Sequence, residues 1–400
     1  MFSQMPHGLG SRYSPLYFLA SLGAGGLSVS FFMWLMFWVP NPDTPVPVFE
    51  AIMAALQGGG FHYQLAIPAA WTGILIFAVL HFRLLLWNIR ELRGFQATEA
   101  YRELRRGNAE TQLLAAPLTV AMSINVAFIL GMSFLPGLWS VVEWLFPLAM
   151  LAFLLVGVWA LALLGNFWGR VLTEGNFDCT ANNSLAQLLP AFALSMVGVG
   201  LSAPAAMSSV AGTVGVSLVL SSFFLVTAVI SGAVQLVLGF RAMLDQAANP
   251  ATAPSLWIVV PIITVLSITL LRQSHGIEAH FGPEAGGVQT LGMLTYFLAA
   301  QVAFGLLGWV VLRRFRYFER FVTGSESSPG SYTLVCPGVA LSVMTHFFVN
   351  VGLVRHGVIA QFGVVFWLLT ALALLLQAAT IWLVIRLNHK HFGLEAMTAT

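Results

Sequence analysis

Charged residues are scarce in this chain of 400 residues, in which Asp, Glu, Lys and Arg make up 8% of the sequence and hydrophobic residues 58%. The mean hydropathy is +0.86. Water-soluble domains contain roughly 25% charged residues, so this composition excludes a soluble fold. The formal net charge of +2 favours no partner of either sign. Long unbroken apolar runs, without the alternation of barrel strands, predict an all-α integral membrane protein.

Cysteine is also rare, with Cys179 in a polar connector and Cys336 in an apolar segment. Two isolated thiols indicate neither a disulfide framework nor a thiolate metal site. The sequence contains no HExxH, GxSxG or Walker-type motif. We therefore predict no catalytic residue, no metal site and no cofactor, and we expect that the protein is not an enzyme. The start, MFSQMPHGLGSRYSP, lacks the features of a cleavable signal.

Apolar segments of about 20 residues are long enough to cross a bilayer as helices. The chain contains ten, which we assign to a single transmembrane domain over residues 1–400. The predicted spans lie near residues 17–39, 66–88, 114–135, 138–165, 185–206, 209–239, 254–272, 288–312, 331–354 and 360–386.

Arginine is unevenly distributed among the connectors. NIRELRGFQATEAYRELRRGNAE, after the second span, and RRFRYFER, after the eighth, are rich in arginine, whereas PNPDTPVPVFE, after the first, contains none. Arginine-rich connectors stay on the cytoplasmic side during insertion. We therefore predict a multi-pass plasma membrane protein, in a bacterium an inner membrane protein, with a short N-terminal segment (1–14) and a C-terminal tail (387–400) in the cytoplasm.

A proline pattern recurs in the odd-numbered spans. It reads APLTVAMSINV, LPAFALSMVGVG, VPIITVLSIT and CPGVALSVMT, with a looser version in SPLYFLASLGAGGLS. Four of the prolines are 73, 71 and 76 residues apart (190 minus 117, 261 minus 190, 337 minus 261). This period predicts a repeated two-helix unit and hence five parallel helical hairpins. The predicted helix-kink prolines are Pro15, Pro117, Pro190, Pro261 and Pro337.

The same odd-numbered spans are rich in small and polar residues, whereas the even-numbered spans are bulky. A proline leaves a carbonyl without its donor, which is costly in lipid. We therefore predict odd helices around a central pore and even helices outside them. The alternative is that the small residues simply let helices pack closely. The predicted pore-lining residues are Ser21, Gly25, Ser28, Ser123, Asn125, Ser195, Gly198, Thr264, Ser267, Ser342, Thr345 and His346.

Acidic residues are absent from the centre of every predicted span. Coupling to protons or sodium usually requires such residues, so the pattern favours an uncharged or anionic solute. Arg272 and Arg355, which border outer connectors, form a predicted vestibule that concentrates anions. Ordinary interfacial solvation is the alternative for both.

His346 is a candidate haem ligand, a proton shuttle, a pore-lining donor or a packed core residue. Haem-binding membrane subunits generally use paired histidines at a suitable depth. The other histidine within a span, His81, lies near the opposite membrane face, which disfavours haem. A haem- or quinone-associated membrane anchor of a redox complex and a coupled exporter of a toxic compound are the alternative functions.

The predicted topology and the segment SYTLVCPGVALS resemble the family of bacterial TehA, the plant guard-cell slow anion channels, and the fungal malate permease and sulfite pump, the tellurite-resistance/dicarboxylate transporter family. The resemblance implies a homotrimer in a lipid bilayer, with a pore in each subunit for small anions such as chloride, nitrate, sulfite and related sulfur oxyanions, or C4-dicarboxylates. Family members close the pore with a phenylalanine beside the ninth-helix proline, where this chain has Leu334, Val335 and Cys336. The gate candidates are Phe347, Phe18, Phe128 and Phe192.

Overall fold

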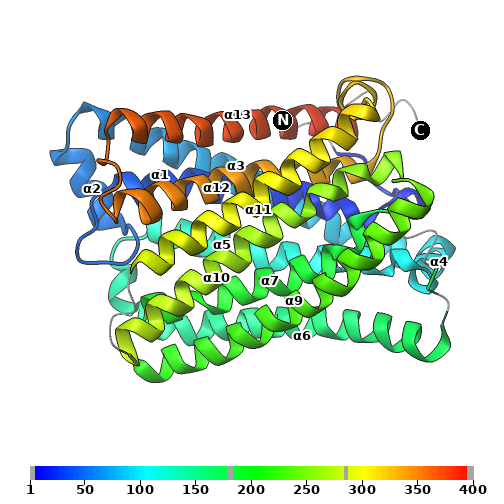
Figure 1. Cartoon of the computed structure of the whole chain (residues 1–400), viewed down its shortest axis with the longest axis horizontal. Coiled ribbons are helices and arrows are strands. Elements are labelled where there is room, and N and C mark those ends of the chain that lie inside the picture. The colour runs from blue at the N-terminus through cyan, green and yellow to red at the C-terminus, as the bar shows by residue number, and fades with distance from the viewer. Residues whose placement is uncertain (1–4, 176, 179–182, 283–286, 394–400) are drawn as a thin grey trace.

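The computed structural model describes residues 5–175, 177–178, 183–282 and 287–393, and Cys179 lies outside them. This part of the chain contains ten helical spans that are long and apolar enough to cross a membrane, and it contains no strand. The prediction of an all-α membrane protein is thus confirmed. The helices run side by side along the long axis of the molecule (Figure 1).

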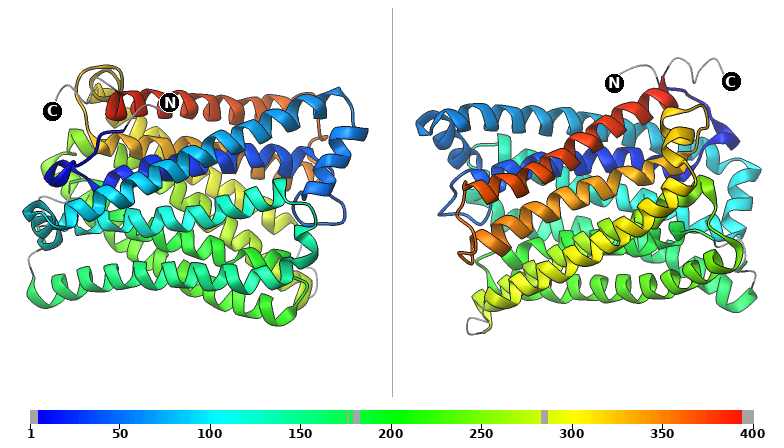
Figure 2. Two further views of the ribbon diagram at one scale, coloured as in Figure 1. Left: turned by 180° about the vertical axis from the view of Figure 1, so that it is seen from behind. Right: turned by 45° about the horizontal axis from the view of Figure 1, so that its top comes forward.

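The two ends of the helix bundle are named here by the short helices that they carry. The α2 end carries α2 (Phe49–Gly58), and the α4 end carries α4 (Glu99–Arg106). The described N-terminal and C-terminal segments both lie toward the α4 end (Figure 2).

Five spans form the interior, with between 61% and 94% of their apolar windows buried. Each begins with a 3-10 segment that continues directly into an α-helix. These inner spans are η2 (Pro15–Tyr17) with α1 (Phe18–Trp38), η3 (Asn108–Leu114) with α5 (Ala115–Phe134), η5 (Leu185–Leu188) with α7 (Leu189–Leu201) and α8 (Ala203–Met207), η6 (Pro250–Ile258) with α10 (Val259–His280), and η8 (Pro329–Leu334) with α12 (Val335–Phe347) and the π-helical η9 (Phe348–Val354).

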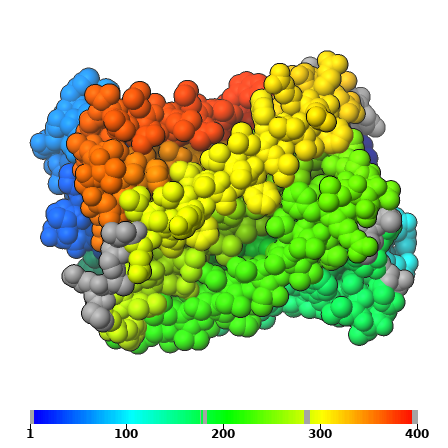
Figure 3. All heavy atoms as spheres, viewed as in Figure 1, coloured from blue at the N-terminus to red at the C-terminus, as the bar shows by residue number. Residues whose placement is uncertain are grey.

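The other five spans form the exterior, with between 17% and 44% of their apolar windows buried. They are α3 (Phe61–Gln96), α6 (Val142–Glu174), α9 (Ala211–Gln246), α11 (Gly287–Arg314) and α13 (Val364–Phe392). Their outward side chains are large and apolar, as Leu86, Leu148 and Val219 illustrate. Figure 3 shows α9 and α11 lying across one face of the molecule. These exposed apolar faces indicate contact with the lipid bilayer.

Several outer helices extend beyond the predicted spans. The second was predicted to end near residue 88 and continues to Gln96, the fourth continues from 165 to Glu174, and the sixth from 239 to Gln246. Hydropathy detects only the part in hydrocarbon, whereas a helix keeps its internal hydrogen bonds after it leaves the membrane.

The inner spans contact one another in a closed order. Helix α1 contacts α5, α5 contacts α7, α7 contacts α10, α10 contacts α12, and α12 contacts α1. Each also packs against the outer helix that follows it in sequence. Glycine permits this close approach, because a Cβ at Gly73 would overlap the ring of Phe31 and one at Gly338 would overlap Thr380.

The repeat prolines lie where each inner span passes from its 3-10 segment into its α-helix, except Pro15, which begins the 3-10 segment η2. Each occupies one of the first three residues of its helix: Pro15 in η2, Pro117 in α5, Pro190 in α7, Pro261 in α10 and Pro337 in α12. Except at Pro15, helical residues precede each proline, so its missing N–H falls where the hydrogen-bonding pattern changes from 3-10 to α. Other prolines lie inside helices of both kinds of span: Pro68 of α3 and Pro147 of α6 in outer spans, and Pro254 of η6 in an inner span. Within the described residues, proline is more frequent in the five inner spans than in the five outer spans, which contain only Pro68 and Pro147.

Polar contacts stabilise the α4 end. The buried carboxylate of Glu110 lies 2.9 Å from the guanidinium of Arg105 and 3.0 Å from that of Arg170. On another side of this end, burial raises the pKa of Tyr317 to about 12. Its hydroxyl therefore stays protonated at neutral pH and shares a hydrogen bond of 2.8 Å with Ser331.

Candidate functional site

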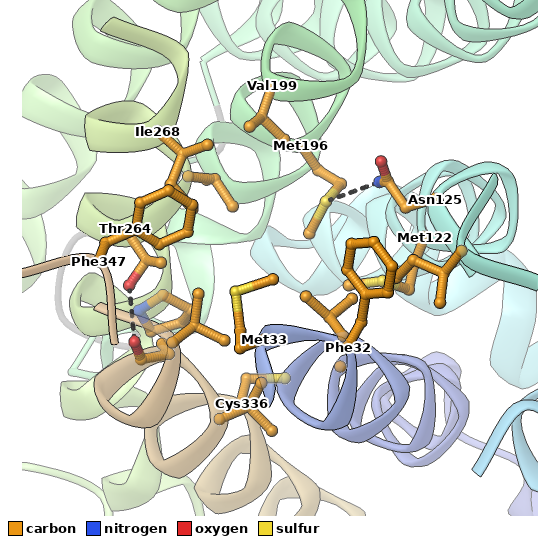
Figure 4. A pocket seen from close by; sticks show the side chains of 18 of the residues that line it. Phe32, Met33, Met122, Asn125, Met196, Val199, Thr264, Ile268, Cys336 and Phe347 are labelled. Carbon is orange, nitrogen blue, oxygen red and sulfur yellow. Dashed lines mark hydrogen bonds between the residues drawn. The ribbon is translucent and has the colours of Figure 1, made fainter. Parts of the chain in front are cut away.

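A cavity of about 170 Å³, here called the central cavity, lies among the inner spans. Its walls come from α1, α5, α7, α8, α10 and α12, together with Val46 in the loop before α2. No residue of an outer span lines it. Figure 4 shows that side chains from separate inner helices, including Met33, Met122, Met196 and Ile268, turn into the same space.

The walls of the central cavity are mostly apolar and include six sulfur-containing side chains. These are Met33, Met36, Met122, Met196, Met207 and Cys336. Three polar or charged side chains interrupt this surface: Asn125, Thr264 and Arg272. No Asp or Glu lines the cavity, so its walls carry one formal charge, which is positive.

Arg272 supplies that charge from α10. Thr264, Ile268 and Arg272 follow one another at intervals of four residues, which places all three on one helix face. The guanidinium donates a hydrogen bond of 2.7 Å to the carbonyl of Val199 on α7. Among the residues that the structure describes, none forms an ion pair with it. A cation without a counter-charge inside a membrane protein is costly, and an anion in the cavity would offset that cost.

Of the predicted pore-lining residues, Asn125 and Thr264 line the central cavity. The Asn125 amide donates to the Ala121 carbonyl at 3.3 Å and approaches the Met196 sulfur at 3.7 Å. The Thr264 hydroxyl contacts the carbonyls of Val260 and Ala340 and accepts a bond from Gln301 of α11. The Thr264 hydroxyl therefore has protein hydrogen-bond partners. The two Asn125 contacts are made by its side-chain nitrogen, and neither involves its carbonyl oxygen.

None of the serines among the predicted pore-lining residues lines the central cavity. Ser342 donates instead to the Ala373 carbonyl of α13, and Ser195 bonds within its own turn to Phe192. Ser267 is fully buried without a partner. The structure thus favours the packing alternative for these residues. The predicted residues placed outside the cavity are Ser21, Gly25, Ser28, Ser123, Ser195, Gly198, Ser267, Ser342, Thr345 and His346.

Three of these residues meet at His81 of the outer helix α3. Nε2 of His81 lies 2.8 Å from the Ser123 hydroxyl, and Nδ1 lies 2.8 Å from the Ser21 carbonyl. The Ser21 hydroxyl donates to the His81 carbonyl at 2.8 Å. Gly25 leaves room for the ring, because a Cβ there would lie 2.8 Å from Nδ1. His81 therefore joins α3 to α1 and α5.

We expect His81→Phe to destabilise the protein by about 1–3 kcal/mol, because the substitution removes the partners of the Ser21 carbonyl and the Ser123 hydroxyl. Thermal unfolding of the full chain in detergent measures the change. The exposed His389 of α13 provides a matched control, His389→Phe, which should unfold as the parent does. An unchanged unfolding temperature for His81→Phe would contradict this structural role.

No family model matches the chain, and a search of curated proteins gives no match. Function must therefore be inferred from the cavity itself. Among the described residues, no group of three or more His, Cys, Asp or Glu side chains is placed to hold a metal ion.

The gate candidates divide into two groups. Phe347, Phe128 and Phe192 line the central cavity, and Phe18 does not. His346, next to Phe347, packs instead against Phe37 and Trp38, with ring centroids 6.4 Å and 6.3 Å apart. Neither of its ring nitrogens has a hydrogen-bond partner. Of these two adjacent residues, Phe347 is the one that lines the cavity.

The two arginines of the predicted vestibule lie in different places. Arg355 lies exposed at the α2 end, with a guanidinium nitrogen 3.3 Å from Nε2 of His275. Arg272 lies inside the central cavity. The sequence interpretation missed this because it ended the seventh span at residue 272, whereas α10 continues to His280. The spacing of four residues between Thr264, Ile268 and Arg272 was the sequence feature that could have placed Arg272 on the same helix face as Thr264.

Proposed function

We propose that the chain is a transmembrane channel or permease for small anions and that the anion passes through the central cavity. Arg272 carries this proposal, because it is the only charged side chain that lines the cavity and it has no acidic partner among the described residues. A preorganised guanidinium in an apolar site attracts an anion more strongly than the same group in water.

The proposed architecture is a ring of five parallel hairpins with an inner helix and an outer helix each. The closed order of inner contacts and the exclusion of outer spans from the cavity support it. We further propose that the α4 end, where the arginine-rich connectors lie, is cytoplasmic, and that the protein is a homotrimer in the plasma membrane. Light scattering of the purified protein with its detergent contribution subtracted would test the trimer.

We expect weakly hydrated monovalent anions such as nitrate and thiocyanate to pass at least about 10-fold faster than sulfate or succinate, because apolar and thioether walls replace little of a hydration shell. One guanidinium also balances only one of two negative charges. Flux assays in proteoliposomes that contain the full chain would measure the order. Equal rates for nitrate and sulfate would contradict this selectivity, and no flux of any of the four anions would contradict the proposed function.

The haem-anchor alternative has weaker support. Both ring nitrogens of His81 already have protein partners, and His346 is packed among aromatic rings. A Soret band in the visible spectrum of the purified protein would reverse this preference.

A further inference from the structure

A second cavity, of about 320 Å³, lies at the α2 end. We call it the α2-end pocket. Its walls come from the end of α1 and the following loop, the start of α3, the π-helical η9 and the loop before α13. Met36 lines both this pocket and the central cavity, so the two spaces are neighbours.

Three amide side chains in the pocket wall donate hydrogen bonds from their N–H groups to backbone carbonyls. Asn41 donates to Thr44 at 2.8 Å, Gln361 to Phe37 at 3.3 Å, and Asn350 to His346 at 2.8 Å. Their carbonyl oxygens therefore remain as acceptors. Asn350 is only 9% exposed, and its Oδ1 has no partner. A buried acceptor of this kind is costly unless a donor reaches it.

Aromatic rings and one cation complete the pocket wall. Phe37, Trp38, Tyr63 and Phe362 contribute rings, and no Asp or Glu lines the pocket. Rings and carbonyl oxygens together stabilise an ammonium group. Arg355 is the cation of the wall, and its guanidinium is suited to bind a carboxylate. Within the described residues it forms no ion pair. The pocket thus presents complementary groups for both charges of a zwitterion.

Irregular backbone occurs at two points of the same wall. Asn350 belongs to a π-helical turn, in which its carbonyl accepts a 3.1 Å bond from the N–H of Arg355, five residues later. Phe362 has a φ of 60°, which is unfavourable for a bulky residue. Such features persist where the surrounding structure holds them, often at functional sites.

We propose that the α2-end pocket binds a small apolar α-amino acid. Its carboxylate pairs with Arg355, its ammonium group lies among the amide oxygens and aromatic rings, and its side chain packs on Met36 and Val351. This site is separate from the central cavity and goes beyond the proposed anion path. Phe37 lines the pocket and packs edge-on against Phe347 of the central cavity at 5.3 Å, so binding is expected to alter anion flux as well.

Isothermal titration calorimetry on the full chain in detergent tests the site with three probes of one shape: L-leucine, isocaproate, which lacks the ammonium group, and isopentylamine, which lacks the carboxylate. We expect L-leucine to bind about 10- to 100-fold more tightly than either analogue, because each analogue loses one charge-assisted contact. Isocaproate binding as tightly as L-leucine would overturn the proposal in favour of a plain carboxylate site. Absence of L-leucine binding would overturn it outright.

Two substitutions identify the contacts. Arg355→Gln should weaken L-leucine binding about 10- to 100-fold, and Asn350→Leu should do the same because it removes the acceptor. Unchanged affinity in Arg355→Gln would overturn the assignment of the carboxylate. If Asn350→Leu does not fold, Arg355→Gln and the three probes still test whether the pocket binds the amino acid.

Arg272→Gln separates this inference from the proposed function. It removes the charge of the central cavity and should leave L-leucine affinity within about 2-fold of the parent. Failure of L-leucine to bind a protein that conducts anions would overturn only the amino-acid site. Tight binding to a protein without anion flux would contradict only the anion path.

Discussion

Arg272→Gln is expected to lower nitrate flux through proteoliposomes about 10- to 100-fold, because the anion loses a charged hydrogen-bond donor worth roughly 1.5–3 kcal/mol. Glutamine keeps a polar side chain with an N–H donor at this position, although it is two bonds shorter than arginine. The substitution therefore tests the charge more than the packing.

Two companion variants define the result for Arg272. Arg272→Lys keeps a positive charge without the planar guanidinium and should retain part of the flux. Arg355→Gln removes a cation from the exposed α2 end and should change the flux by less than about 2-fold at physiological salt, where exposed charges are screened. Nitrate flux at the parent level in Arg272→Gln would mean that the cavity charge does not serve the anion.

Composition was sufficient to identify the spans and to suggest which of them are buried. Glycine, serine and threonine are frequent in the odd-numbered spans, whose helices are largely buried, but they are also frequent in the sixth span, the outer helix α9. Composition alone does not show which face of a buried helix adjoins a cavity. Ser342 illustrates the difficulty: its hydroxyl bonds to the outer helix α13, and the cavity wall is formed by Val339, Val343 and Phe347 of the same helix.

The residues that line the central cavity follow helical spacing, which is visible in the sequence once one member is known. On α1 they are Leu22, Gly23, Gly26, Val29, Phe32, Met33 and Met36. This stripe is apolar, so nothing in its chemistry separates it from a stripe that packs against a neighbour. The position of Arg272 depended on the length of α10, and hydropathy places helix ends least reliably where charges begin.

A small space, here called the narrow passage, lies on the α4-end side of the central cavity. A space of only about 10 Å³ remains there, lined by residues of η2, α1, η5, α7, η6 and η8. That volume is close to the minimum for a single water. Four of its lining residues precede a residue of the central cavity by three positions, about one helical turn. The pairs are Leu19 with Leu22, Leu189 with Phe192, Ile258 with Pro261, and Thr333 with Cys336.

We infer that this narrow passage continues the same axis and blocks it in the observed conformation. Leu16, Leu19, Leu189 and Ile258 make it apolar, and a constriction of this kind stops ions because water leaves it. The double variant Leu189→Ala with Ile258→Ala is expected to raise nitrate flux at least about 10-fold, since both truncations widen the passage and lower the barrier to hydration.

Matched variants distinguish an opened passage from a loosened protein. Leu194 and Ile262 are buried in the same two inner spans and line neither space, so Leu194→Ala with Ile262→Ala removes the same atoms away from the axis. This pair should leave the nitrate flux near that of the parent. A rise in both double variants would indicate general leakage and would contradict a gate at Leu189 and Ile258.

Phe347→Ala asks whether the closure lies instead within the central cavity. Phe347 lines that cavity and is held edge-on by Phe37, so it lies on the opposite side of the cavity from the narrow passage. If the α4-end passage is the barrier in series, truncating Phe347 alone leaves the slow step in place and the flux should stay low. Because Arg272 is intact in the Leu189 and Ile258 variant, its faster flux should still favour nitrate over sulfate. A faster flux that no longer discriminates would place both the barrier and the selectivity at the passage and would remove the role assigned to Arg272.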